Sequence, residues 1–100
     1  MGSSKAALEA LCRQMAVEWA LHGISVNVVA PGLLETDTLA VLDDAAARVR
    51  HEIASPLGRM VRLEEVARLV HFLCSSASEG ILGQTIMIDG GKSISAFCPV

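Results

Sequence analysis

Two short runs rich in β-branched residues, separated by helical sequence, limit the possible folds of this chain more than any other feature. The first run is ISVNVVAPG at residues 24–32, and the second is TIMIDGG at residues 85–91. Each run predicts a short buried strand. Strands joined through helices form a parallel pair with a right-handed crossover. Because two strands cannot bury their own faces and edges, the sequence predicts an α/β structure that is part of a larger sheet.

The segment from Ser3 to Leu21 predicts one long helix that ends at the His22-Gly23 pair. Helical spacing gives this segment two apolar faces. A surface helix ordinarily has one apolar stripe, so we expect this helix to be packed on both sides. One face comprises Leu8, Cys12, Met15 and Trp19, and the nearly opposite face comprises Ala6, Ala10, Val17 and Leu21.

More helical sequence lies between the two predicted strands. Residues 35–54 predict two helical pieces, and SPLGRM at residues 55–60 predicts a loop. Leu63–Cys74 predicts a further helix with Glu64 paired to Arg68 on its surface. The apolar side chains expected to face inward from this helix are Val66, Leu69, Val70 and Leu73.

Composition narrows the environment and the partners. The chain is 52% apolar but has only two phenylalanines and one tryptophan, so a core would be built from Ala, Val, Leu and Ile. The net charge of −3 is not clustered, which argues against nucleic acid or an anionic membrane as a partner. Glu9, Arg13 and Glu18 interrupt the first apolar run, which excludes a signal peptide or a membrane span there.

The cysteines favour a reducing compartment. Cys12 and Cys74 fall on apolar faces of predicted helices, where a free thiol behaves as a small hydrophobic group. With Cys98 they make an odd number at wide spacing, so a disulfide or metal framework is the less favoured alternative. We therefore expect buried free thiols and a cytoplasmic location.

Five segments, in this order, resemble the C-terminal part of the short-chain dehydrogenase/reductases. They are SSKAALEAL, GISVNVVAPG, ETD, GRM followed by EEVARLVHFL, and GQTIMIDGG. The resemblance implies a Rossmann-type doubly wound parallel sheet that binds NADH or NADPH. Residues 1–100 would supply the last two strands and their helices within a single domain, and the N-terminal half of that domain would be missing.

GSSKAALEALCR, SPLGRMV and ILGQTIMIDGGKSI are particularly similar to the bacterial enoyl-acyl-carrier-protein reductase branch. That similarity implies hydride transfer to an enoyl- or 3-oxoacyl-thioester of fatty acid synthesis in a full-length protein, with this chain inactive alone. The family's common pattern places a catalytic Tyr where Met1 stands, whereas the enoyl branch places it further upstream. The chain contains no Tyr and no G-x-G-x-x-G loop. A lost Tyr and a variant spacing both stay open.

Lys5 is the candidate catalytic residue that the resemblance implies. Its ammonium would bind the ribose hydroxyls of the nicotinamide nucleotide and lower the pKa of the Tyr. The alternative from the residues alone is a solvated lysine at a helix start.

Pro31 and Gly32 follow a predicted strand, and open α/β sheets bind ligands beyond the carboxyl ends of their strands. Glycine also allows close approach of backbone to a ligand. By resemblance, the backbone near Leu34 and the hydroxyl of Thr36 would contact the nicotinamide carboxamide or the pyrophosphate. The alternative is an ordinary strand-to-helix turn with Thr36 as the N-cap.

The remaining polar residues predict no metal site. Asp89 is a single carboxylate without nearby partners, which is poor for a divalent cation. His22, His51 and His71 are expected to point to solvent. The resemblance further implies a homo-oligomer formed through the helix at 3–21 and the strand at 84–89. The alternative function is a non-catalytic oligomerisation module.

Overall fold

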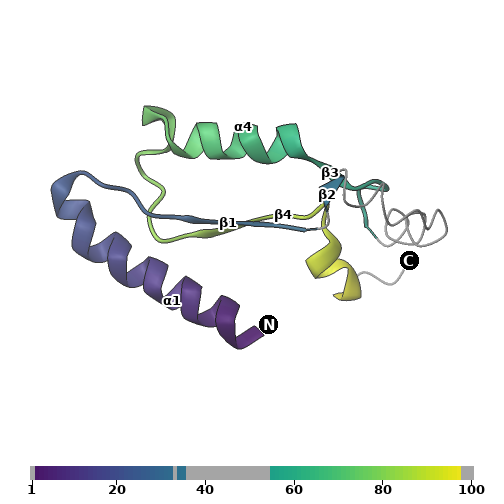
Figure 1. Cartoon of the computed structure of the whole chain (residues 1–100), viewed down its shortest axis with the longest axis horizontal. Helices are drawn as coiled ribbons and strands as arrows, with labels where there is room; N and C mark the ends of the chain where they lie inside the picture. The colour runs from purple at the N-terminus through teal and green to yellow at the C-terminus, as the bar shows by residue number, and fades with distance from the viewer. Residues whose placement is uncertain (1, 33, 36–54, 98–100) are drawn as a thin grey trace. The chain divides into compact units, whose positions relative to one another are not determined.

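The computed structural model describes residues 2–32, 34–35 and 55–97 (Figure 1). The chain divides into two compact units, one formed by residues 1–30 and 69–86 and the other by residues 31–68 and 87–100. Its elements are α1 (Gly2–Trp19), η1 (Ala20–His22), β1 (Val28–Pro31), β2 (Leu34–Glu35), β3 (Val61–Arg62), α4 (Leu63–Leu73), η2 (Ser76–Ser78), β4 (Thr85–Ile88) and η3 (Lys92–Phe97).

β1 and β4 form the parallel pair that the sequence predicts. In the first unit the N–H of Val28 donates to the carbonyl of Gln84 at 2.8 Å. In the second unit the N–H of Gly32 donates to the carbonyl of Ile88 at 3.1 Å. Because the partner numbers rise together, the two strands run in the same direction. The prediction of an α/β structure with parallel strands is confirmed.

Both strands are shorter than predicted. Residues 24–27 precede β1 without strand structure, because the N–H of Ile24 is used to close the preceding helix. At the other end, Gly90 and Gly91 have φ angles of 67° and 86°, which turn the chain away from the ladder after Ile88. The side chain of Asn27 bridges the segment before β4, donating to the carbonyl of Ile81 at 2.9 Å and accepting from the N–H of Gln84 at 3.0 Å.

The predicted helix at 3–21 is confirmed as α1 followed by η1. Its packing differs from the prediction. The buried side is centred on Cys12 and Ala16, each 3% exposed, whereas Leu8 and Trp19 are exposed. The opposite face, including Val17 and Leu21, is also exposed. Cys12 lies against the segment before β1, where its thiol donates to the carbonyl of Val26 at 3.6 Å. Thus a single narrow side of α1 is covered within the first unit.

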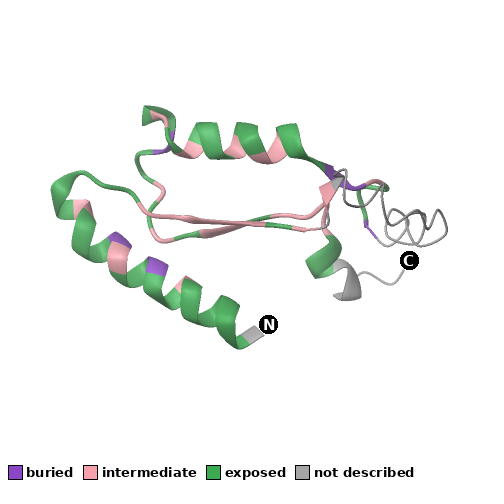
Figure 2. Cartoon of the chain, in the orientation of Figure 1, coloured by how far each residue is buried: buried purple, intermediate pink, exposed green. Residues whose placement is uncertain are grey.

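The covered side is narrow because the segment that packs on it is a loop. Gly83, with φ 70°, lies so close to α1 that a Cβ atom there would be 3.3 Å from Cβ of Ala16. Small residues on both sides allow this approach. In the first unit, α1 and the C-terminal end of α4 are drawn on opposite sides of the strand pair (Figure 1), and exposed positions predominate on both helices (Figure 2).

α4 confirms the helix predicted from Leu63, but it ends at Leu73. Cys74 therefore lies in the following turn and is exposed, so the predicted burial of this thiol is wrong. Both Cys12 and Cys74 are free. Among the described residues no ion pair joins Glu64 to Arg68. The adjacent Glu65 pairs with Arg59 at 2.6 Å and also accepts from the N–H of Arg62 just before α4.

The second unit contains a parallel pair that the sequence did not predict. β2 pairs with β3 in the register Leu34 to Val61 and Glu35 to Arg62. Val61 and the preceding Met60 are buried, and so is Ser55. Glu35, where the predicted helical stretch at 35–54 begins, lies in β2 instead, because it pairs with Arg62. The rest of that stretch, residues 36–54 with His51, lies outside the described residues. His22 and His71 are exposed, as predicted. None of the described helices combines the length and hydropathy that crossing a membrane requires.

Candidate functional site

The carboxyl ends of β1 and β4 bring two of the glycine-containing motifs together in the second unit. Pro31 ends β1 and Gly32 follows it, while Asp89, Gly90 and Gly91 follow β4. In parallel strands these ends meet at one edge, and that edge is where open α/β sheets bind ligands. Pro31 and Gly32 therefore lie at this edge of the strand pair.

Gly32 has a structural role that the sequence did not reveal. A Cβ atom at this position would lie 2.7 Å from Cβ and 3.0 Å from Cα of Asp89, which is too close for any side chain. The glycine thus permits the end of β1 to pass directly beside the end of β4. From the sequence alone, the space beside Gly32 is assigned to a ligand. In the described structure, Asp89 lies in that space.

The carboxylate of Asp89 is held by its own turn. Its Oδ1 accepts from the N–H of Gly91 at 2.9 Å and its Oδ2 from the N–H of Ser93 at 3.0 Å. A side-chain hydrogen bond from Ser93, followed by these backbone donors, lowers the pKa of Asp89. Asp89 is therefore ionised at neutral pH, and its carboxylate is bound by the N–H groups of its own turn. Within the described ranges, no group of three or more His, Cys, Asp or Glu side chains could hold a metal ion.

Ser55 is a residue of this region that sequence reasoning missed. Its side chain is almost completely buried, at 7% exposed. Its Oγ donates to the carbonyl of Gly90 at 3.0 Å and accepts from the N–H of Leu57 at 3.2 Å. The N–H of Leu57 also reaches the carbonyl of Gly90 at 3.0 Å. The Ser-Pro pair marks a turn in the sequence, but nothing local indicates that the turn is bound to residue 90.

Leu34 lies in β2, opposite Val61, and is half-buried. Leu34 and Glu35 thus form a short parallel ladder with Val61 and Arg62 after Gly32. Thr36 lies outside the described residues. Pro31, Gly32 and Leu34 all belong to the second unit.

Lys5 belongs to the first unit and lies near the start of α1, with its side chain exposed.

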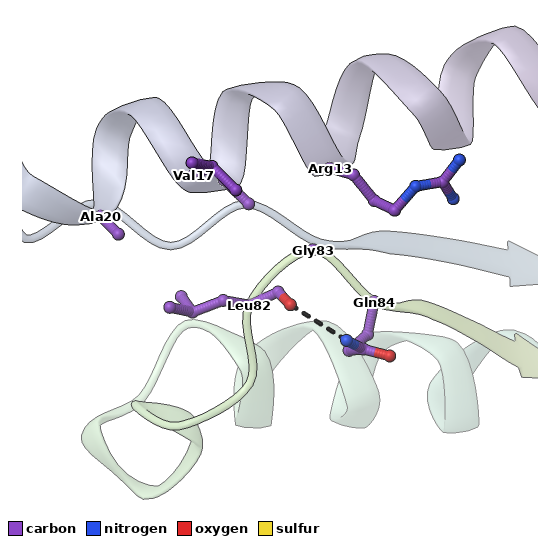
Figure 3. Close-up of a pocket in the computed structure, with 7 residues that line it drawn as sticks. Arg13, Val17, Ala20, Leu82, Gly83 and Gln84 are labelled. Carbon is purple, nitrogen blue, oxygen red and sulfur yellow. Dashed lines mark hydrogen bonds between the residues drawn. The ribbon is translucent and has the colours of Figure 1, made fainter.

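The first unit also carries an apolar groove that contains none of the predicted site residues. It has a volume of about 440 Å³ and lies between α1 and the loop before β4 (Figure 3). Val17 and Ala20 extend from the helix toward the loop, where the side chain of Gln84 donates to the carbonyl of Leu82 at 3.1 Å (Figure 3). Its lining residues are Arg13, Ala16, Val17, Ala20, Leu82, Gly83 and Gln84.

Comparison with known proteins decides the family. The family model described as "Enoyl-(Acyl carrier protein) reductase" matches residues 1–93. The chain belongs to the short-chain dehydrogenase/reductase family. A tropinone reductase homologue of Arabidopsis thaliana is 42% identical over 97 residues, which cover 96% of this chain and 36% of the relative.

Solved structures of short-chain dehydrogenases/reductases share the fold. A gluconate 5-dehydrogenase from Burkholderia cenocepacia, in complex with NADP and tartrate, is 36% identical with a TM-score of 0.80, covering 92% of this chain and 36% of that one. A 4-hydroxyisoleucine dehydrogenase in complex with NADH is 28% identical with a TM-score of 0.82, covering 92% and 38%. The chain therefore spans little more than a third of the length of these relatives. The Rossmann-type fold predicted from the sequence is confirmed, and related proteins bind either nucleotide.

Proposed function

We propose that this chain acts as part of an NAD(P)-dependent oxidoreductase that transfers a hydride between the nicotinamide and a small carbonyl or alcohol substrate. The observation that carries this proposal is the meeting of Gly32 and Asp89 at the carboxyl edge of a parallel strand pair. Members of the family bind a dinucleotide, and the general rule for α/β sheets places ligands at this edge. Either NADH or NADPH is compatible with the related complexes.

The residues present suit the nicotinamide end of such a cofactor. Lys5 would donate hydrogen bonds to the ribose hydroxyls of the nicotinamide nucleotide. Pro31 and Gly32 would lie beside the nicotinamide, the backbone of Leu34 would bind its carboxamide, and Thr36 would add a hydroxyl. When bound, the cofactor supplies or accepts the hydride. The sequence has no Tyr, so a proton donor of that kind comes from outside residues 1–100.

For the substrate, two classes have support. The description of the family model names an enoyl-acyl-carrier-protein reductase, which is compatible with the enoyl- or 3-oxoacyl-thioester that the sequence resemblance implies. The names of the relatives, a tropinone reductase homologue and a gluconate 5-dehydrogenase, support a free ketone or secondary alcohol. Reduction of a ketone is common to the 3-oxoacyl-thioester and the free ketone, and we favour it for that reason.

The proposal includes a homo-oligomer in the cytoplasm. The free thiols of Cys12 and Cys74 suit a reducing compartment. The exposed apolar residues Val17 and Leu21 on α1 support an assembly through residues 3–21, and exposed Met87 supports a contribution from residues 84–89.

A hybrid enzyme tests the proposed role of Lys5. Residues 1–93 would replace the matching region of the Burkholderia gluconate 5-dehydrogenase, and NADP-linked activity would be measured with gluconate, a ketone and a 3-oxoacyl-thioester. Lys5→Met should lower kcat by about a hundredfold or more, as expected for loss of a group that supports acid–base catalysis. Arg68→Met, at an exposed cation on α4, is the matched control and should leave kcat unchanged.

Equal kcat in the Lys5→Met and Arg68→Met hybrids would remove Lys5 from the mechanism. The 100-residue chain by itself should show no saturable binding of NADH or NADPH in calorimetric titration, because the pyrophosphate site of these folds is a glycine turn before a helix that this sequence does not contain. Micromolar binding by the chain alone would contradict the proposal that it is only part of the enzyme.

A further inference from the structure

The turn Asp89–Gly91 contacts two segments that are far apart in the sequence. On one side it contacts the end of β1, at Gly32. On the other side it contacts the turn that begins at Ser55. Both contacts lie within the second unit, and at both of them a glycine lies too close to its neighbour to accept a Cβ atom.

The contact with β1 is made by backbone. The N–H of Gly32 donates to the carbonyl of Ile88, and Cα of Gly32 faces Asp89 without room for a methyl group. The carboxylate of Asp89 is in turn fixed by the N–H groups of Gly91 and Ser93. The position of Gly32 is therefore set by the conformation of the turn.

The contact with Ser55 is equally close. The carbonyl of Gly90 accepts from both the hydroxyl of Ser55 and the N–H of Leu57. Gly90 has φ 67°, and a Cβ atom there would lie 2.5 Å from Oγ of Ser55. Gly91 has φ 86°, and a Cβ atom there would lie 3.0 Å from Cγ of Pro56. Neither glycine can be replaced without displacing residues 55–57.

Leu34 is connected through the backbone to both contacts. It follows Gly32 closely in the chain, and it pairs in β2 with Val61 of β3, which follows the turn begun at Ser55. A shift of the Asp89–Gly91 turn would thus reach Leu34 by two routes, through β1 and through β3.

We propose that the Asp89–Gly91 turn and Ser55 are positioning elements for the nicotinamide dinucleotide, because they set the place of the Gly32 and Leu34 backbone at the carboxyl edge of the sheet. The inference rests on the proposed function, in which that backbone contacts the nicotinamide. Neither Ser55 nor Gly90 touches the reacting atoms. Their effect is on cofactor affinity through Gly32 and Leu34.

Gly90→Ala is the main test, and Gly23→Ala is its matched control. Both glycines have a positive φ, 67° and 73°, so both variants carry similar backbone strain. A Cβ atom at Gly23 has no atom within 4 Å, whereas at Gly90 it meets Ser55. In the hybrid enzyme, Gly90→Ala should raise the Kd for NADPH by about tenfold to a hundredfold, as expected when hydrogen bonds to a ligand are lost. Gly23→Ala, in the first unit, should leave this Kd within about twofold of the parent value.

Ser55 gives an independent test by rescue. Ser55→Ala removes the donor to the carbonyl of Gly90 and the acceptor for the N–H of Leu57, and should also weaken NADPH binding. Ser55→Thr keeps the hydroxyl and should restore most of the affinity. In Gly90→Ala and in Ser55→Ala, the KM for the carbonyl substrate should change less than the KM for the dinucleotide. An equal rise of both KM values would mean a general structural defect and would overturn the proposal.

Hydrogen exchange on the 100-residue chain separates this inference from the proposed function. Mass spectrometry of peptides covering residues 31–35 and 55–62 should show faster exchange in both peptides for Gly90→Ala, and in neither peptide for Gly23→Ala. Unchanged exchange at residues 31–35 in Gly90→Ala would overturn the positioning role, whatever the hybrid does. A hybrid without dinucleotide-linked activity would count against the proposed function, while the exchange result would still decide the positioning.

Discussion

At Glu65 a single carboxylate oxygen accepts two hydrogen bonds. Its Oε1 accepts from Nη1 of Arg59 at 2.6 Å and from the N–H of Arg62 at 3.0 Å. Arg62 immediately precedes α4, so Glu65 reaches back from the first turn to the N-cap backbone, as the acid of a capping box does. The hydrogen bond from Arg59, and after it the one from Arg62, lowers the pKa of Glu65 from 4.5 to about 2.

This depressed pKa predicts a loss of stability in acid. An acid whose pKa is lower in the folded than in the unfolded chain stabilises the fold above its unfolded pKa, and the stabilisation disappears as pH falls toward the folded pKa. Between pH 4.5 and about 2, the parent chain should therefore lose more thermal stability than Glu65→Gln. Circular dichroism melts at a series of pH values measure this. Glu64→Gln, at the exposed neighbouring acid, is the control, and a parent-like pH profile for Glu65→Gln would contradict the prediction.

At the scale of an element, α1 shows how one residue ends a helix. Gly23 has φ 73°, its N–H donates to the carbonyl of Ala20 at 3.0 Å, and the N–H of Ile24 donates to the carbonyl of Trp19 at 3.2 Å. This pair of bonds is the Schellman arrangement, in which a left-handed residue satisfies the last carbonyls of a helix. It also directs the chain from α1 into the segment that leads to β1.

Gly23→Ala should destabilise the chain by about 1–2 kcal/mol, because a Cβ atom is unfavourable in the left-handed conformation. No atom lies within 4 Å of the added Cβ, so the cost is one of backbone strain alone. Gly80→Ala is the control, since its Cβ is equally unobstructed and its backbone is not in the left-handed region. Urea unfolding of the two variants should separate them, and equal midpoints would show that Gly23 is not required to end the helix.

At the scale of the whole molecule, the described residues bury few side chains. The buried apolar residues among them are Cys12, Ala16, Met60 and Val61, and each unit holds two. On α1 the large apolar residues Val17 and Leu21 are 74% and 90% exposed. Such surfaces mark sites that another protein surface covers, which supports the proposed self-association.

Val17→Glu should therefore reduce self-association of the chain, because contact with a second copy would bury an unpaired charge. The cost is of order several kcal/mol per contact, enough to shift the equilibrium strongly. Light scattering should show smaller particles for Val17→Glu, with helix content retained. Ala7→Glu, at an exposed position of the same helix outside both apolar faces, is the control. An unchanged particle size in Val17→Glu would exclude this face of α1 as the contact.

The sequence by itself determined the helices α1 and α4, the positions of strands β1 and β4, and the parallel direction of these strands. It also determined the family. These features depend on local periodicity, on runs of β-branched residues and on motif order, all of which are present in the linear chain. For the same reason, the sequence alone places Pro31 and Gly32 at the carboxyl end of a strand.

Only the tertiary structure decided which side of α1 is buried, that Cys74 is exposed, and that Leu34 pairs with Val61. It also decided that the space beside Gly32 belongs to Asp89, and that Ser55 binds Gly90. Each of these depends on two segments that are distant in the sequence and close in space. No local pattern encodes such a pair, because either half is compatible with many partners until the chain has folded.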